Sequence, residues 1–368
     1  MKKILFLINT LDGGGAEKVL VDTVNALDKT KYDITVQTVT DRGTFKDRLK
    51  NNVKYKSIVK IKNDFLQRVF MYIINFILPP RVVYQLFIRD GYDYEVAFIE
   101  GVPTKLISAS SSRKSIKYAW VHIDLYNTFG LEKVYKNIQH HIVCYKKYDK
   151  IICVSNSAKE AFIKRFGIND KVTVKHNVIN DHYIREKSKE PIEKSKKMCI
   201  VTVGRLEHQK GMDRLLKIHK SLMDEGFDYD LLIIGQGSKR KKLEEYVKNN
   251  LLSESVKFIG FTDNPYKYMA TADLIVYPSR AEGYSTVAVE AIILGKPVVV
   301  TDCSGMREIF GDSQYGLVTE NNDEALYNGI KQMITDPELR KRYIEMAKIR
   351  SEDFSLEKRV KELETLFS

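Results

Sequence analysis

The sequence has few residues that cross-link a chain or break its regular structure. Its 368 residues include only four cysteines, eight prolines and one tryptophan. The cysteines stand singly, without a Cys-x-x-Cys pair or a Cys/His cluster, which argues against a disulfide framework and a zinc site. No run reaches the roughly 18 apolar residues that a membrane span needs. Repeats and low-complexity tracts are also missing, which disfavours solenoids and disordered chains.

The N-terminus resembles a secretion signal only in its first residues. Met1, Lys2 and Lys3 precede an apolar run, but the run ends at Asp12 and three glycines, and no small-x-small cleavage site follows. We interpret this run as a first β-strand. The expected location is therefore the cytoplasm, with peripheral attachment to the inner face of the cell membrane as an option.

Positive charge is concentrated in the first half of the chain. The net charge is +12, and residues 1–185 carry 31 Lys and Arg against 18 Asp and Glu. The remaining residues are nearly balanced, with 29 against 30. Such asymmetry predicts a polyanionic partner, either nucleic acid or an anionic membrane surface. Because no helix-turn-helix, RRM or zinc signature occurs, a nucleic-acid-binding protein is the weaker alternative.

Short apolar runs alternate with turns and amphipathic stretches throughout the chain. This rhythm predicts an α/β protein with two doubly wound, parallel-sheet, Rossmann-like domains. The expected strands are 3–9, 34–40, 95–100, 118–122, 150–155, 198–204, 230–235, 256–260, 274–277 and 298–301. Predicted boundaries are 1–185 and 186–350 for the domains and 351–368 for a terminal helix that packs back toward the first domain. The polar stretch 185–197 reads as a linker.

Two glycine-containing loops follow predicted strands at their carboxyl ends, where ligands bind in such sheets. Gly13, Gly14 and Gly15 open a helix, and a helix N-terminus favours anions, although a tight turn alone explains one or two glycines. In the second domain, Arg205 and Lys210 flank a loop that begins at Gly204. Together these cations suit a diphosphate, whereas each alone reads as a solvated surface charge.

A third motif brackets seven residues between Glu282 and Glu290. Glu290 lies in an otherwise apolar helix, where a carboxylate is costly unless it has polar partners. The N–H groups near 284–286 lie at the start of this helix and suit phosphate oxygens. A purely structural glutamate is the competing interpretation.

Taken together, the motifs resemble a family 4 glycosyltransferase of GT-B architecture. The matching segments, in family order, are GGGAEKVL (13–20), VGRLEHQKG (203–211), IIGQGSKRKKLEE (233–245), FIGFTDNPYKYMATADLIVYPS (258–279) and RAEGYSTVAVEAIILGKPVVVTDCSGMREI (280–309). The similarity is dense over 200–310 and thinner over 40–150. It departs from the family where Tyr284-Ser285 replaces a frequent Phe-Gly, which leaves sugar identity open.

The resemblance implies a retaining transfer of a sugar from a nucleotide diphosphate sugar, with UDP preferred, to a glycan or lipid-linked acceptor in bacterial surface polysaccharide synthesis. It implies an acceptor-side first domain and a donor-binding second domain. Catalytic roles would fall to Glu282, His122, Arg205 and Lys210. The donor-binding set would be Gly14, Gly15, Gly204, Arg205, Lys210, Gly235, Phe261, Thr262, Glu282, Gly283, Tyr284, Ser285, Thr286 and Glu290. Glu100 and Ser155 are acceptor-binding candidates.

No metal or other cofactor is expected. Asp228-Tyr229-Asp230 imitates a metal-binding DxD motif, but it precedes a strand and so falls at the amino edge of the sheet. A GT-B-type nucleotide-sugar epimerase is the rival enzyme, although it would need acid and base carboxylates that the motifs do not supply.

Residues 65–89 contain an apolar run from Val69 to Pro80, which is broken by Asn75 and flanked by Arg68, Arg81 and Arg89. It is too short to span a membrane. Such a segment either lies in a membrane interface or packs into the core, and the sequence leaves both readings open.

Overall fold

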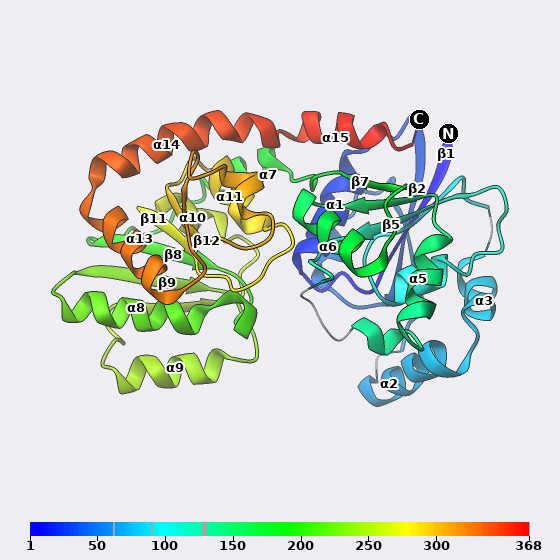
Figure 1. Ribbon diagram of the computed structural model, residues 1–368, viewed down its shortest axis with the longest axis horizontal. Helices are drawn as coiled ribbons and strands as arrows, with labels where there is room; N and C mark the ends of the chain where they lie inside the picture. Colours follow the sequence, from blue (N-terminus) through cyan, green and yellow to red (C-terminus); the bar gives the residue numbers. More distant parts are fainter. Residues whose placement is uncertain (62, 90, 127–130, 368) are drawn as a thin grey trace. The chain divides into compact units, whose positions relative to one another are not determined.

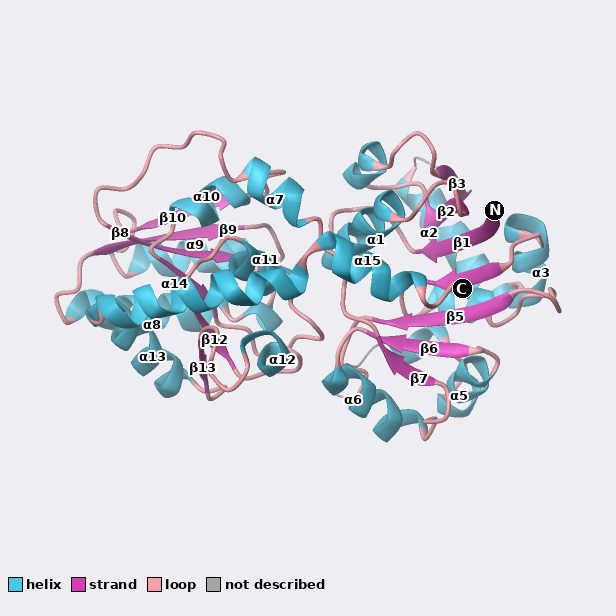
Figure 2. Cartoon of the chain, turned by 90° about the horizontal axis from the view of Figure 1, so that it is seen from above, coloured by secondary structure: helices cyan, strands magenta, loops and turns pink. Residues whose placement is uncertain are grey.

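The computed structural model describes residues 1–61, 63–89, 91–126 and 131–367. The chain forms two compact units, which are described separately. Unit 1 comprises Met1–Ile179 with Glu357–Ser368, and unit 2 comprises Asn180–Leu356. Figure 1 and Figure 2 show that each unit is built around one sheet with helices on its faces, as the sequence predicts.

Unit 1 contains a seven-stranded sheet in which every pair of neighbours is parallel. Its order is β3-β2-β1-β4-β5-β6-β7. The strands are β1 (Lys2–Ile8), β2 (Tyr32–Thr40), β3 (Lys54–Val59), β4 (Tyr94–Ala97), β5 (Ile116–Val121), β6 (Lys150–Cys153) and β7 (Val172–Val174). The central strand β1 is fully buried from Ile4 to Ile8 because helices cover both of its faces.

The helices of unit 1 connect these strands. They are α1 (Gly15–Ala26), η1 (Thr44–Arg48), α2 (Asp64–Tyr72), η2 (Ile73–Ile77), α3 (Pro80–Val83), η3 (Tyr84–Ile88), α4 (Val102–Ile107), η4 (Leu131–Val134), α5 (Ile138–Lys146), α6 (Asn156–Phe166) and α15 (Leu356–Glu364). Among the described residues, none of the helices is both long enough and apolar enough to cross a bilayer.

Unit 2 contains a six-stranded parallel sheet of order β10-β9-β8-β11-β12-β13. Its strands are β8 (Met198–Val203), β9 (Tyr229–Ile234), β10 (Val256–Gly260), β11 (Leu274–Tyr277), β12 (Val298–Thr301) and β13 (Leu317–Thr319). Its helices are α7 (Asp181–Lys187), η5 (His208–Lys210), α8 (Met212–Asp224), α9 (Arg240–Asn249), α10 (Tyr266–Thr271), α11 (Thr286–Ile293), α12 (Met306–Phe310), α13 (Asp323–Thr335), α14 (Pro337–Ser351) and η6 (Glu352–Phe354). In Figure 1, α8 and α9 lie below this sheet, and α11 and α14 lie above it.

The predicted linker 185–197 differs from the structure at its start. Residues 185–187 belong to α7, and the division between the units falls at Ile179 instead of 185. The helix forms because the Asn180 side chain accepts the N–H of Tyr183 and because Ile184 is buried. The two buried residues of α7, Asp181 and Ile184, precede residue 185, so the polar composition of 185–197 does not reveal the helix.

The C-terminal residues 357–368 belong to unit 1, not to the unit that precedes them in sequence. Phe367 is almost completely buried, and its ring packs edge-on against Phe6, Tyr32 and Tyr94. The hydroxyl of Tyr118 donates a hydrogen bond to the carbonyl of Leu366 at 2.7 Å. The end of the chain therefore completes the core of unit 1.

Aspartates at the amino ends of the strands have structural roles. Asp93 accepts the N–H of Lys3 at 2.7 Å, so it joins two neighbouring strands. In the DxD sequence, Asp228 pairs with Lys197 at 2.5 Å, and Asp230 accepts the hydroxyl of Ser195. This pair lies at the amino end of β9, where the sequence places it.

Candidate functional site

Three glycines lie at the carboxyl ends of three neighbouring strands of unit 2. Gly204 follows β8, Gly235 follows β9, and Gly260 ends β10. The N–H of Gly235 donates to the carbonyl of Gly260 at 2.9 Å. A Cβ on Gly235, whose φ is 137°, would lie 2.0 Å from the carbonyl oxygen of Gly204. Only glycine fits there, so backbone without side chains lines this edge of the sheet.

Lys210 and Glu282 form an ion pair at the same edge. Lys210 ends η5, and Glu282 lies in the loop between β11 and α11. The Nζ of Lys210 is 2.5 Å from Oε1 of Glu282, and the hydroxyl of Ser279 donates to the same oxygen at 2.6 Å. The two charged side chains are only 19% and 10% exposed. Their interaction is therefore less screened by water than that of a surface pair.

The start of α11 carries a buried hydroxyl with no hydrogen-bond partner in the described part of the chain. Ser285 is the N-cap residue and is 3% exposed, but its side chain makes no capping hydrogen bond. The first N–H groups of a helix lack intrahelical acceptors and carry partial positive charge. A hydroxyl donor beside these N–H groups suits an anion with several acceptor oxygens.

Glu290 lies in the same helix and is 3% exposed. Burial raises the pKa of Tyr277, and the nearby charges of Glu290 and Glu282 raise it further. Tyr277 therefore stays protonated, and its hydroxyl donates a hydrogen bond to the carbonyl of Val287 at 2.8 Å. After β10, Phe261 projects its ring outward with 47% exposure. The neighbouring residue Thr262 accepts the N–H of Asn264.

In unit 1, the predicted glycine loop forms the start of α1. Gly14 is the N-cap residue, and Gly15 is the first residue of the helix. The carbonyl of Gly14 accepts the N–H of Lys18 at 3.0 Å, so the helix begins normally without a side-chain cap. A Cβ on Gly14 would lie 2.3 Å from Oε2 of Glu17, so glycine leaves room for this carboxylate at the start of the helix.

Glu100 and His122 lie at the carboxyl ends of the neighbouring strands β4 and β5. Oε1 of Glu100 accepts the N–H groups of His122 at 2.6 Å and of Ile123 at 3.1 Å. The imidazole packs 5.1 Å from the ring of Phe98, and its Nε2 is buried without a hydrogen-bond partner among the residues described. Burial lowers the pKa of His122 to about 4, so this ring is neutral at physiological pH.

Glu100 gives the first testable prediction. Burial raises its pKa to about 7 from an ordinary value of 4.5, against the opposing effect of backbone hydrogen bonds from Glu100 itself, His122 and Ile123. Between these two pH values the folded chain keeps a proton on Glu100 that the unfolded chain has lost. The contribution of this protonated carboxyl to the free energy of unfolding is therefore fully present below about pH 4.5 and is lost as the pH rises through 7. Glu100→Gln should remove this loss, so its stability relative to wild type should increase by about 3 kcal/mol between pH 4.5 and 8.

Denaturant unfolding across this pH range measures the difference. Glu160→Gln, an exposed glutamate of α6 in the same unit, is the matched control and should run parallel to wild type. A Glu100→Gln curve that also runs parallel to wild type would contradict the raised pKa.

Ser155 has a structural role in the fold. It is completely buried, and its hydroxyl accepts the N–H of Ala158 as the N-cap of α6. Binding of a sugar acceptor by Ser155 stays a prediction. The burial of Ser155 and its role as the N-cap of α6 do not favour it.

Comparison with known proteins agrees with this arrangement. A sequence profile described as Glycosyltransferase Family 4 matches residues 13–183, and one described as Glycosyl transferases group 1 matches residues 184–350. A Campylobacter jejuni protein named N-acetylgalactosamine-N,N'-diacetylbacillosaminyl-diphospho-undecaprenol 4-alpha-N-acetylgalactosaminyltransferase is 32% identical over 270 residues, which are 72% of this chain and 70% of that protein. The chain belongs to the family 4 glycosyltransferases.

Two further relatives cover nearly the whole glycosyltransferase chain. A second Campylobacter jejuni protein, an alpha-1,4-N-acetyl-D-galactosaminyltransferase whose name specifies an undecaprenol-linked acceptor, is 25% identical over 97% of this chain and 95% of its own. An Anabaena structure solved in complex with UDP superposes with a TM-score of 0.78 at 20% identity, covering 100% of this chain and 99% of that one. The latter likeness establishes the fold as GT-B.

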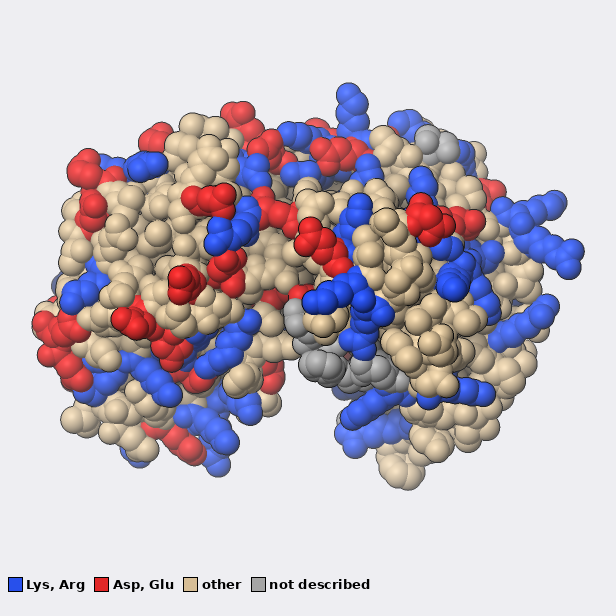
Figure 3. Space-filling view, viewed as in Figure 1, with Lys and Arg blue, Asp and Glu red and all other residues tan. Residues whose placement is uncertain are grey.

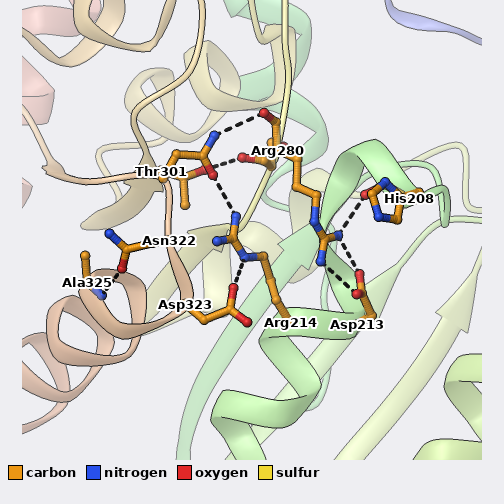
Figure 4. Close-up of polar contacts among 10 residues, drawn as sticks. His208, Asp213, Arg214, Arg280, Thr301, Asn322, Asp323 and Ala325 are labelled. Carbon is orange, nitrogen blue, oxygen red and sulfur yellow. Dashed lines mark hydrogen bonds and ion pairs between the residues drawn. The ribbon is translucent and has the colours of Figure 1, made fainter.

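Hydrogen bonds of Arg280 in the transferase connect the segments that carry Lys210 and Glu282. Figure 4 shows Arg280 reaching Asp213 with both terminal nitrogens, at 2.7 and 2.8 Å, and the carbonyl of His208 at 2.9 Å. The N–H of Arg280 donates to the carbonyl of Gln209 at 2.7 Å. These bonds join η5 and the first turn of α8 to the loop before α11. The sequence motifs do not reveal these hydrogen bonds, because the bonds connect residues about 70 positions apart.

Breaking this network should lower activity without removing any residue of the ion pair. Arg280→Gln and Asp213→Asn should each reduce kcat/KM by about tenfold, because the geometry between Lys210 and Glu282 loosens. The double variant should be little worse than either single one, which corresponds to a coupling of about 1–2 kcal/mol. Arg280→Lys should restore little, because lysine lacks the forked geometry.

Steady-state donor turnover tests this prediction. Lys341→Gln, which removes an exposed ion pair with Glu338 on α14, is the control and should match wild type. Additive losses in the double variant would show that Arg280 and Asp213 act independently.

Proposed function

We propose that this glycosyltransferase transfers a sugar from a UDP-sugar to a lipid-linked glycan acceptor, with retention of configuration and without a metal ion, in the synthesis of a bacterial surface polysaccharide. The Lys210–Glu282 ion pair carries the proposal. It puts one cation and one carboxylate together beside side-chain-free backbone at the carboxyl edge of the sheet.

The donor diphosphate would bind at the start of α11. Its oxygens would accept hydrogen bonds from the first N–H groups of the helix and from the unpartnered hydroxyl of Ser285. Lys210 and the exposed Arg205 would neutralise the charge of the leaving group. Glu290 would hold the ribose hydroxyls, and Glu282 those of the donor sugar. UDP is preferred because the Anabaena structure of the same fold was solved with UDP.

We also propose roles for two features of unit 1, His122 and the start of α1. A neutral imidazole can donate or accept a hydrogen bond to a sugar hydroxyl, and the lone Nε2 of His122 would gain the partner that it lacks. The N–H groups at Gly14 and Gly15 would contribute further donors. Glu100 would act as a positioning residue, since it fixes the backbone of His122.

In the proposed reaction, the bond between the sugar C1 and the diphosphate oxygen breaks as the acceptor oxygen bonds to C1 on the same face. The acceptor's proton passes to the departing phosphate oxygen, so no separate carboxylate base is required. Negative charge develops on the leaving diphosphate, and the two cations stabilise it. This role of Lys210 and Arg205 is the reason for proposing metal independence.

The acceptor class rests on the relatives. Both Campylobacter jejuni proteins have undecaprenol-linked acceptors in their names. We therefore propose that the enzyme works at the inner face of the cell membrane, where such acceptors are embedded.

The decisive experiment is a panel of UDP-, GDP- and ADP-sugars, incubated with the enzyme in EDTA and analysed for nucleoside diphosphate release. Release from a UDP-sugar, which Glu290→Ala and Arg205→Ala abolish, supports the proposed donor site. Retention is tested by NMR of the anomeric proton of the product. Release that requires divalent metal would refute metal independence, and sugar epimerisation without acceptor would favour the epimerase alternative.

A further inference from the structure

The connection between β3 and β4 of unit 1 forms a helical arm, residues 64–88, made of α2, η2, α3 and η3. Its inner side belongs to the core, with Ile74, Val83 and Tyr84 almost fully buried. The buried Lys105 of α4 donates to the carbonyl of Asn75 at 2.7 Å. The hydroxyl of Tyr84 donates to Glu95 at 2.8 Å. These contacts fix the arm to the rest of the unit, so its surface is preformed.

The outer side of the arm is also apolar, although nothing in the described structure covers it. Half of the exposed large apolar side chains of the described residues lie in this arm. The six most exposed, here called the outer face, are Phe65, Leu66, Tyr72, Phe76, Ile77 and Leu86. Phe65 is 72% exposed and Ile77 62%. The core does not require these side chains, because the inner side already anchors the arm, so their exposure to water indicates an interaction surface.

The charges around the outer face are almost all positive. Between residues 60 and 89 the sequence has five Lys and Arg and one acidic residue, Asp64. Lys60, Arg68, Arg81 and Arg89 are exposed. On the face drawn in Figure 3, blue side chains also outnumber red ones over unit 1. Apolar side chains flanked by cations complement the headgroups and acyl boundary of an anionic bilayer.

We propose that the outer face inserts into the interface of an anionic lipid bilayer and that the flanking arginines bind its phosphate headgroups. The arm lies along the surface without crossing it, since no described helix is long and apolar enough to span. The inference deepens the proposed function, because a lipid-linked acceptor is presented at that surface. Binding to lipid is nevertheless measured without donor or acceptor, so each proposal can fail alone.

The test is co-sedimentation of the full chain with vesicles of phosphatidylcholine alone and with vesicles that also contain about a quarter phosphatidylglycerol. Wild type should sediment with the anionic vesicles, less at high salt, and weakly with the neutral ones. The double variant Phe76→Ser/Ile77→Ser should lower the partition coefficient by about tenfold or more. Arg68→Gln/Arg81→Gln should lower binding to anionic vesicles and leave the residual binding to neutral ones unchanged.

Ile349→Ser is the matched control. Ile349 is 60% exposed on α14 of unit 2, so the variant removes a similar apolar side chain from a helix outside the arm. It should sediment like wild type, and all variants should keep wild-type donor hydrolysis in solution. Equal sedimentation of Phe76→Ser/Ile77→Ser and wild type would overturn the proposal. So would light scattering that shows a wild-type dimer which this variant abolishes, because a second copy of the chain would then cover the outer face.

Discussion

Lys210→Ala should lower kcat by about 10²–10³ while KM for the donor changes much less. The variant removes the cation that lies 2.5 Å from Glu282, and both side chains of this pair are mostly buried. Charge develops on the leaving diphosphate mainly in the transition state, so the loss falls on kcat. Single-turnover and steady-state measurements with the donor identified by the panel separate the two parameters.

Lys296→Ala is the control for losing a partly buried lysine. Lys296 donates to the carbonyl of Ala272 and precedes β12, at the opposite edge of the same sheet. Its variant should keep the wild-type kcat even if it is less stable. A similar loss of kcat in both variants would show that Lys210 acts through stability alone, and an unchanged kcat in Lys210→Ala would remove this residue from the mechanism.

Gly211→Ala should damage both stability and activity. Gly211 has a φ of +67° and ends the loop that carries Lys210. A Cβ there would lie 1.9 Å from the carbonyl oxygen of Pro278, so the loop must move away from the segment that leads to Glu282. We expect about 3 kcal/mol or more of destabilisation, from left-handed strain plus the backbone clash. Displacement of the ion pair should lower kcat/KM by about 10².

Gly167→Ala separates the effect of left-handed backbone strain from that of the steric clash. Gly167 has the same φ of +67°, but a Cβ there would meet no atom within 4 Å. This variant should therefore cost only the strain of about 1–2 kcal/mol and leave activity intact. If both variants were equally mild, the close approach of Gly211 to Pro278 would not constrain the site.

The sequence predicts the central strands of both sheets but misses three others. The missed strands, β3, β7 and β13, all lie at sheet edges. An edge strand pairs on one side only, so it can be short, as at Val172–Val174, or rich in lysine, as at Lys54–Val59. Central strands are apolar on both faces, and hydrophobic runs reveal those directly.

Local motifs single out the proposed donor-side residues mainly from strand ends and from the start of α11, and they single out Glu290 because it is a carboxylate in an apolar helix. The Lys210–Glu282 pair could be guessed from neither motif alone, because it joins residues 72 positions apart. The same holds for Arg280 and Asp213. On the arm, the sequence shows that residues 65–89 are apolar but not that the segment is two-sided. That distinction depends on which side chains the core of unit 1 leaves uncovered.

The position of Phe367 has a consequence for biosynthesis. The chain leaves unit 1 at Ile179, forms all of unit 2, and only then returns with the residue that packs against Phe6 and Tyr94. When the ribosome has synthesised all of unit 2, the core of unit 1 therefore still lacks the ring of Phe367. We therefore expect unit 2 to fold before unit 1, and a nascent chain arrested before residue 357 should contain a folded second unit and a protease-sensitive first one.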